Sequence, residues 1–137
     1  MTEIIDFYID PPIGDVDLND LFDRAWPSHA PGAYEAVLAR SLGFIGAFAD
    51  AKLIGFVNLA TDGGEHAFLL DPTVDREYRH RGIGLELVRR AADLARSRGC
   101  KWLHVDYEPS LAPFYQAAGF RESLAGVMRL NSEPRDR

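Results

Sequence analysis

Val74-Asp75-Arg76-Glu77-Tyr78-Arg79-His80-Arg81-Gly82-Ile83-Gly84 is the stretch of this 137-residue chain that decides its fold. It joins the apolar run 66–74 to an amphipathic segment that begins near Gly84. Two glycines at a strand-to-helix junction let the backbone turn tightly and bring its N–H groups close to a bound group. Because a helix N-terminus has unpaired N–H donors and a partial positive charge, we expect an anion to bind there.

Basic side chains surround the two glycines: Arg76, Arg79, His80 and Arg81. The alternative is an ordinary loop, in which glycines permit a positive φ and the basic side chains are solvated. The motif is not the dinucleotide fingerprint, because Leu87 takes the place of the third glycine, and it is not a P-loop, because no Gly-Lys-Ser/Thr follows. The turn therefore predicts a phosphate-bearing ligand only in combination with its surroundings.

Length and composition are those of one globular domain. We expect a single domain, 1–137, with a polar tail at 131–137. No apolar run approaches the ~20 residues of a membrane helix. Cys100 is the only cysteine, and the acidic N-terminus does not resemble a secretory signal, so we expect a cytoplasmic protein without an internal disulfide.

The charges are unevenly distributed along the chain. Residues 1–75 hold thirteen acidic and three basic side chains, whereas 76–101 hold three acidic and eight basic ones. The formal net charge of −6 argues against nucleic acid as a partner, because nucleic-acid-binding proteins usually present a basic face. A basic patch in an acidic protein suits a small polyanion, and the acidic half suits a cationic second substrate.

Hydrophobic periodicity and turn residues predict a mixed α/β domain. Strands are expected at 4–9, 42–49, 53–61, 66–74 and 102–105, helices at 17–26, 33–41, 84–98 and 110–118, and one or two final strands within 121–130. The strand at 102–105 is expected to be buried on both faces. Because a helix connects the strands at 66–74 and 102–105, these two strands should be parallel.

A second motif, Phe114-Tyr115-Gln116-Ala117-Ala118-Gly119-Phe120, follows the fifth strand. With the Arg-x-x-Gly-x-Gly turn at 79–84 and the order of elements, it makes the chain resemble the GNAT superfamily of acyl-CoA-dependent N-acyltransferases. The resemblance covers about residues 3–130, and its most specific part is 70–120. It implies an α/β fold with a mixed central sheet, of order β-α-α-β-β-β-α-β-α-β-β, whose fourth and fifth strands splay apart. Pro72 fits such a splay, and equally an ordinary bulge.

The resemblance implies that acetyl-CoA is the co-substrate and that the turn binds its pyrophosphate through backbone N–H groups. The fourth strand would pair with the pantetheine arm, and a backbone N–H there would meet the oxyanion of the reaction. The residues expected to contact the cofactor or the reacting carbonyl are Thr73, Val74, Arg79, His80, Arg81, Gly82, Ile83, Gly84, Ser110 and Phe114. Ser110 has a simpler interpretation as the cap of the helix at 110–118.

The implied reaction is direct attack of a neutral primary amine on the thioester in a ternary complex. Tyr115 would be the general acid for the departing thiolate, since its ordinary pKa of ~10 keeps it protonated at neutral pH. The alternative is a core tyrosine whose hydroxyl only finds a partner. Asp71, Asp106 and Glu108 are candidate general bases, although a carboxylate at such a position is more often simply solvated at a strand end.

The chain departs from the family pattern at two positions. Glu108 stands where many members have an asparagine, seven residues before the tyrosine, and Asp75 follows the valine where a proline is usual. The histidines predict no metal site, because His104 and Asp106 alternate on one strand without a third ligand in view.

Three functions remain open at this point. The first is acetyl-CoA-dependent N-acetyltransfer to a small-molecule or peptide amine, with neither nucleic acid nor membrane as a partner. The second is a non-catalytic CoA-binding or sensing domain, because a fold does not prove turnover. The third is a module that binds another phosphorylated ligand. Dimerisation is common in the family, so a homodimer is a candidate assembly.

Overall fold

A computed structural model of the chain describes residues 3–131. The chain falls into two compact units, 1–105 and 106–137, and each is described by itself. Of the expected polar tail at 131–137, only Asn131 belongs to the described residues.

The first unit contains a five-stranded sheet and the helices on its two faces. Its strands are β1 (Ile5–Ile9), β2 (Gly43–Ala49), β3 (Lys52–Thr61), β4 (His66–Val74) and β5 (Trp102–His104). Its helices are α1 (Asp15–Ala25), α2 (Glu35–Arg40), the 3₁₀ helix η1 (Arg76–Tyr78) and α3 (Ile83–Ser97). The second unit contains the 3₁₀ helix η2 (Pro109–Leu111) and α4 (Ala112–Ala117).

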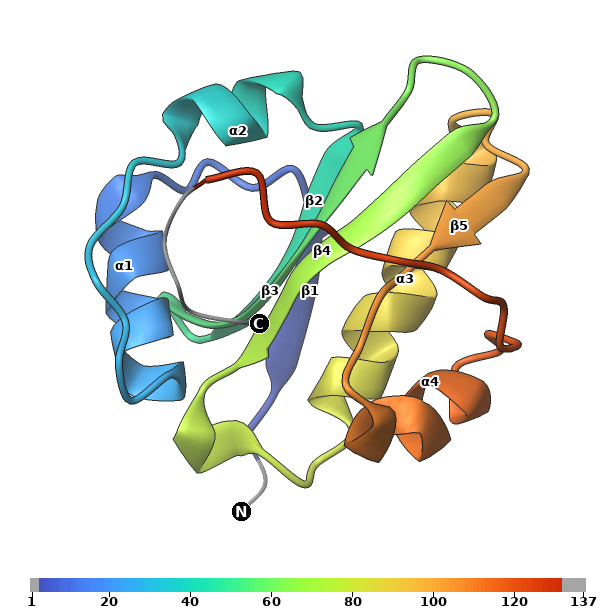
Figure 1. Cartoon of the computed structure of the whole chain (residues 1–137). Coiled ribbons are helices and arrows are strands. Elements are labelled where there is room, and N and C mark those ends of the chain that lie inside the picture. Colours follow the sequence, from blue (N-terminus) through green and yellow to red (C-terminus); the bar gives the residue numbers. More distant parts are fainter. Residues whose placement is uncertain (1–2, 132–137) are drawn as a thin grey trace. The chain divides into compact units, whose positions relative to one another are not determined.

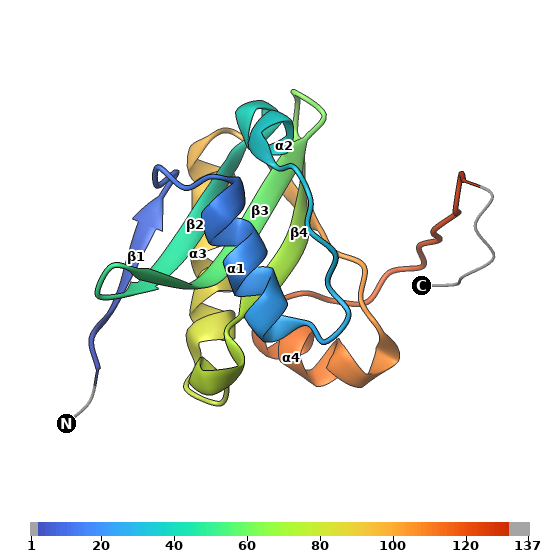
Figure 2. The same cartoon turned by 90° about the vertical axis from the view of Figure 1, so that its left-hand side faces the viewer.

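The predicted mixed sheet is confirmed. Its strands lie in the order β1-β2-β3-β4-β5, antiparallel from β1 to β4 and parallel between β4 and β5. In Figures 1 and 2, α1 and α2 cover one face of this sheet and α3 covers the other. The parallel pair follows from the helix that connects β4 to β5 across the sheet.

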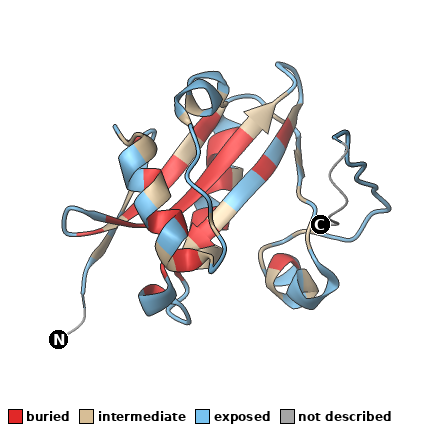
Figure 3. Cartoon of the chain, turned by 60° about the vertical axis from the view of Figure 1, so that its left-hand side comes forward, coloured by how far each residue is buried: buried red, intermediate tan, exposed pale blue. Residues whose placement is uncertain are grey.

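Buried residues lie on the strands of the sheet and on the helices that cover it, as the red segments of Figure 3 show. On the α1 side, Leu18, Leu21 and Phe22 pack against Leu53 and Phe56 of β3. On the other side, α3 buries the apolar stripe that its sequence predicted: Ile83, Leu87, Val88, Ala91, Leu94 and Ala95. This burial fixes α3, and with it the turn at its N-terminus, against the sheet.

A glycine in the middle of the sheet allows α3 to approach closely. A Cβ atom at Gly55 would lie 3.1 Å from Cδ1 of Leu87 and 3.1 Å from Cβ of Ala47, tighter than most real contacts. Glycine is therefore the residue that fits between β2 and the helix at this point.

Strands β4 and β5 pair only over a short distance. The ladder joins His66–Phe68 to Trp102–His104, while β4 continues to Val74. In the part of β4 beyond this ladder, the register between β3 and β4 shifts: Phe56 pairs with Thr73, whereas Asn58 pairs with Leu70. Asp71 and Pro72 therefore form a β-bulge, one of the two interpretations of Pro72.

Several local expectations were wrong. Helix α1 begins at Asp15 and not at 17, because Gly14 is its N-cap. Asp17, the third residue of the helix, accepts a hydrogen bond from the Gly14 N–H at 3.2 Å. Strand β5 is not buried on both faces, since Trp102 is 55% exposed. Ser110 does not cap α4, because η2 occupies 109–111 and Leu111 is the N-cap.

The strands expected within 121–130 are also absent from the described residues, where this segment contains no regular structure. Its apolar side chains are exposed: Leu124, Val127, Met128 and Leu130. A strand is stable only when a neighbouring strand accepts and donates its backbone hydrogen bonds. The apolar pattern alone therefore predicted a strand for which the described residues provide no pairing.

Candidate functional site

The turn between η1 and α3 has the backbone conformation of an anion site. His80 and Gly82 both adopt left-handed conformations, with φ of 65° and 79°. Left-handed residues in a turn can direct neighbouring backbone N–H groups toward one anion. Within residues 3–131, no protein acceptor receives a hydrogen bond from any backbone N–H between Arg79 and Leu85, and the first bonded amide is Glu86, which donates to Gly82 at 3.1 Å.

Two of the arginines at this turn bind other protein groups. Arg79 donates from Nη2 to the carbonyl of Ala25 at 2.8 Å, at the last residue of α1. Arg81 lies 3.7 Å from Glu3 and packs over the ring of Tyr78, with 4.8 Å between guanidinium and ring centre. An anion at this turn would therefore be attracted first by the backbone N–H groups and the helix dipole.

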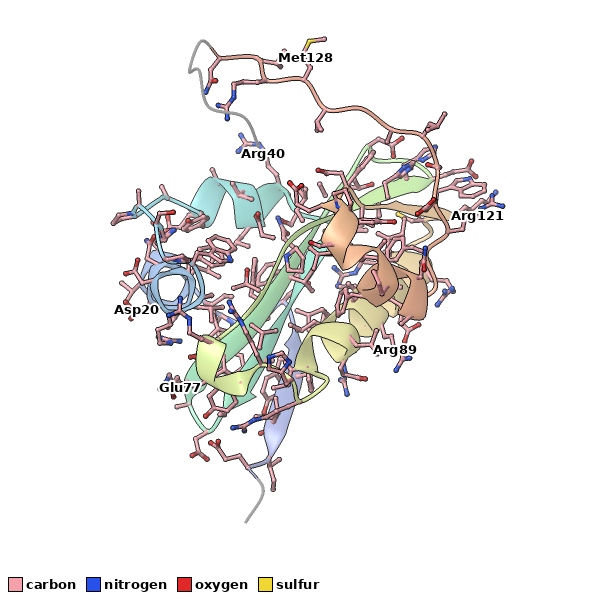
Figure 4. All side chains as sticks on the ribbon, turned by 60° about the horizontal axis from the view of Figure 1, so that its bottom comes forward. Asp20, Arg40, Glu77, Arg89, Arg121 and Met128 are labelled. Atoms are coloured by element: carbon pink, nitrogen blue, oxygen red, sulfur yellow. The ribbon has the colours of Figure 1, made fainter. Side chains whose placement is uncertain are left out.

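The side chain of Asp75 fixes the start of the turn. It is 1% exposed, accepts from Arg24 at 2.7 Å and from the Glu77 N–H at 2.9 Å, and lies 3.8 Å from Lys52. Burial alone would raise the pKa of this carboxyl, but the bond from the Glu77 N–H and the charge of Arg24 outweigh it, and the pKa lies below its usual value. Figure 4 labels Glu77 on η1 and Arg89 on α3, the two elements on either side of the turn.

The end of β4 carries a titratable group in a strained conformation. Asp71 has φ of 54°, and Thr73, which is buried, donates from its hydroxyl to the Asp71 carbonyl at 2.9 Å. Partial burial raises the pKa of the Asp71 carboxyl above its usual value. A non-glycine residue in this region is uncommon and concentrates at functional sites.

In the second unit, Tyr115 lies at the centre of an aromatic cluster. Its ring stacks on Tyr107 at 4.7 Å between centroids and meets Phe114 and Phe120 edge to face. Burial, and then the nearby Asp106 and Tyr107, raise the pKa of the Tyr115 hydroxyl. The hydroxyl therefore stays protonated at neutral pH, which is what a proton donor requires.

The remaining predicted site residues lie in the same unit. Glu108 is exposed and precedes η2, where its carbonyl accepts from the Leu111 N–H at 2.9 Å. Ser110 is exposed within η2, and Phe114 is partly buried within α4. The predicted residues thus divide between the two units: 71–84 belong to the first and 108–115 to the second.

No group of three or more His, Cys, Asp or Glu side chains within residues 3–131 is placed to hold a metal ion. The two histidines at the β4–β5 ladder, His66 and His104, bond to each other at 2.7 Å between ring nitrogens. In the same described part of the chain, no helix combines the length and the apolar character that a membrane crossing requires.

A known protein family matches the greater part of this chain. The model of the Acetyltransferase (GNAT) family matches residues 15–120, which include the turn at 79–84 and Tyr115. This chain belongs to the GNAT family.

Solved structures of GNAT proteins share the fold. An acetyltransferase of the GNAT family from Streptococcus pneumoniae TIGR4 superposes with a TM-score of 0.80 at 21% identity, over 95% of this chain and 100% of that one. An aminoglycoside N-acetyltransferase in complex with CoA gives a TM-score of 0.72 at 21% identity, over 96% and 97% of the two chains.

A curated relative is similar over part of the chain. Glucosamine 6-phosphate N-acetyltransferase 1 from Oryza sativa subsp. japonica is 42% identical over 52 residues, which are 38% of this chain and 32% of that protein. The chain spans about a third of the length of the glucosamine 6-phosphate N-acetyltransferases that it matches.

The sequence predicted a role for the turn and for Tyr115, and it did not predict the groups that anchor the turn. Arg24 lies 51 positions from Asp75, and no periodicity or motif connects them. The one available signal was Asp75 itself, a carboxylate where the family pattern usually has a proline. A charged residue in a position that the fold buries needs a partner of opposite charge.

Proposed function

We propose that this GNAT protein transfers the acetyl group of acetyl-CoA to a primary amine by direct attack in a ternary complex. The observation that carries this proposal is the row of backbone N–H groups from Arg79 to Leu85 without a protein acceptor, at the N-terminus of α3. Such a row matches the negatively charged pyrophosphate of CoA. The thioester would lie along the outer edge of β4, beyond its short ladder with β5.

In the proposed reaction, the amine nitrogen attacks the carbonyl carbon, the new C–N bond forms, and the C–S bond breaks. A backbone N–H near Thr73 or Val74 stabilises the oxyanion between these two steps. Tyr115 gives its proton to the departing thiolate. Asp71 takes the proton that the amine loses, since its raised pKa lies closer to neutral pH than that of an ordinary aspartate.

The acceptor that we propose is a cationic amine. Burial, and then the charges of Asp71, Asp15 and Asp23, raise the pKa of Tyr34, and Oδ1 of Asp15 accepts a hydrogen bond from the Tyr34 N–H at 2.7 Å. A second positive charge on the acceptor would bind favourably there. Glucosamine 6-phosphate, the acceptor named for several relatives, would bring a phosphate into the same negative field.

The experiment measures CoA thiol release from acetyl-CoA with a panel of amines. Aliphatic diamines and polyamines should raise release above background hydrolysis, and glucosamine 6-phosphate should raise it less. If glucosamine 6-phosphate is the better acceptor, the charge argument is wrong. If no amine raises release while CoA still binds in calorimetry, the protein is a CoA-binding domain without turnover.

Replacing Tyr115 by Phe tests the proposed acid. Removal of the hydroxyl should lower kcat about 10²-fold or more and leave CoA affinity nearly unchanged, because a general acid acts only in the transition state. Phe120→Leu is the matched control, since it perturbs the same aromatic cluster without removing a proton donor. Full activity of Tyr115→Phe would assign the acid to another group.

A further inference from the structure

The carboxylate of Asp75 is a buried charge at the point where β4 passes into the anion-binding turn. Isolated burial of an ionised carboxylate is strongly unfavourable, so its partners must compensate for the lost hydration. Every polar group of Asp75 is engaged. Oδ1 accepts from the Glu77 N–H at 2.9 Å, Oδ2 accepts from Nε of Arg24 at 2.7 Å, the backbone N–H donates to Ile54 at 2.8 Å, and the carbonyl accepts from Tyr78 at 2.9 Å.

The main partner of Asp75 comes from the last turn of α1. Arg24 bonds to Asp75 through Nε and to the carbonyl of Leu53 through Nη2 at 2.8 Å, so its guanidinium is held at two points. Such a bonded arginine has a fixed orientation, unlike an exposed one. Arg24 therefore connects the last turn of α1, the start of β3 and the start of the turn.

A second residue of the turn, Arg79, is tied to the same helix. Arg79 donates to the carbonyl of Ala25, the last residue of α1, at 2.8 Å. Basic side chains commonly satisfy the free carbonyls of a helix C-terminus. The turn is therefore attached to α1 at two points, through Asp75 just before it and through Arg79 just before His80.

The segment after α1 bears aromatic side chains of the first unit. Trp26, the C-cap of α1, stacks on Phe22 at 4.4 Å between centroids. Tyr34, at the other end of this segment, also contacts Phe22. A movement of the last turn of α1 would therefore shift the anion-binding turn and this aromatic segment together.

We propose that Asp75 and Arg24 are positioning residues, which hold the turn from Arg76 to Gly82 in its anion-binding conformation without touching the ligand. The inference rests on the proposed use of this turn for CoA. The proposal predicts that CoA affinity depends on the Asp75–Arg24 pair, although the polar atoms of this pair bond to protein groups. It also predicts that the two residues act as one unit.

The test is a double-mutant cycle on the CoA dissociation constant. Asp75→Asn keeps an acceptor for the Glu77 N–H and removes the charge, and Arg24→Gln removes the guanidinium. Each should weaken CoA binding about tenfold, and the double variant should be no weaker than the worse single variant. The KM for acetyl-CoA should rise likewise, whereas kcat at saturating acetyl-CoA should change little.

Arg98→Gln is the matched control. Arg98 also bonds to one carboxylate, Asp10 at 3.1 Å, and to one backbone carbonyl, that of Leu42, but at the opposite end of α3 from the turn. This variant should lose stability while its CoA affinity stays at the wild-type value. Wild-type CoA affinity in both Asp75→Asn and Arg24→Gln, with stability lowered as in the control, would overturn the proposal.

A readout without CoA separates this inference from the proposed function. The amide protons of Tyr78 and Glu86 bond to the carbonyls of Asp75 and Gly82 within the turn. Their hydrogen exchange should be faster in Asp75→Asn than in Arg98→Gln at matched stability, and equal rates would contradict the positioning role. Absence of CoA binding by the wild-type protein would refute the proposed function, and the exchange rates would still decide the positioning role.

Discussion

Asp71 combines two features that motivate a functional hypothesis. Its backbone is in the left-handed region at a bulge of β4, and partial burial raises the pKa of its carboxyl. Neither feature helps the fold, because a strained backbone and a disfavoured charge both lower stability. This combination suits the base that we propose for the reaction.

Asp71→Asn should increase stability at neutral pH. The pKa of this carboxyl is higher in the folded chain than in the unfolded chain. Ionisation therefore favours the unfolded chain, and stability is lost as pH rises from the unfolded pKa through the folded pKa. Asparagine removes the charge and tolerates the left-handed conformation. The melting temperature of the variant should exceed that of the wild type at pH 7, and the difference should vanish near and below pH ~3.9. Turnover should fall in the same variant.

Asp62→Asn provides a control of opposite sign. The exposed carboxyl of Asp62 accepts from the Gly64 N–H at 2.8 Å, and this bond is the main reason that its pKa is lowered. Stability from this group is present above the unfolded pKa and disappears as pH falls through the folded one. Asp62→Asn should therefore not stabilise the protein at pH 7. Equal gains in both variants would trace the effect to net charge alone.

At the scale of elements, the turn and α3 form one unit with the sheet. The N-cap of α3 is Gly82 in the left-handed conformation, and the helix is fixed by its buried apolar stripe. The direction of the free N–H groups therefore depends on local backbone angles at the turn and on the packing of the helix behind it.

Gly82→Ala tests this backbone conformation. A Cβ at Gly82 would meet no atom within 4 Å, so the substitution costs only backbone strain of about 1 kcal/mol. Relaxation of this strain would turn the N–H groups away and weaken CoA binding, while Gly82→Asn should bind better than Gly82→Ala. Calorimetry with CoA and urea unfolding measure the two effects.

Gly63→Ala is the control for this substitution. Gly63 also has a positive φ, of 83°, and open space around its Cβ position, but it lies in the turn between β3 and β4. It should lose similar stability and keep wild-type CoA affinity. Equal CoA affinities of the two alanine variants would remove Gly82 from the binding site.

At the scale of the whole molecule, the chain separates its charges. The acidic side chains dominate residues 1–75, and the basic ones gather in 76–101, which include the turn at 79–84 and α3. A local positive field in a protein of net charge −6 attracts a polyanion to one place and repels it elsewhere.

Acetyl-CoA binding should therefore weaken with salt. Raising ionic strength from about 0.1 M to about 1 M shortens the Debye length from ≈ 10 Å to ≈ 3 Å, and the KM for acetyl-CoA should rise several-fold. The acetyl thioester of pantetheine, which lacks the phosphates, should show a nearly constant KM over the same range. Parallel changes for both thioesters would indicate that salt acts on the protein rather than on phosphate recognition.

The sequence by itself determined the features that depend on neighbouring residues. Glycines at 82 and 84, the helical spacing of apolar residues after them and the crossover to 102–105 predicted the turn, α3 and the parallel pair of strands. These signals are local, because φ preferences and the 3.6-residue period act within a few positions along the chain.

Only the tertiary structure decided which distant groups meet. It paired Asp75 with Arg24, 51 positions away, and placed Arg79 on the carbonyl of Ala25. It also left 121–130 without strands, although the apolar pattern there favours them. The reason is that a buried charge or a strand is stabilised by a partner from elsewhere in the chain, and packing selects that partner.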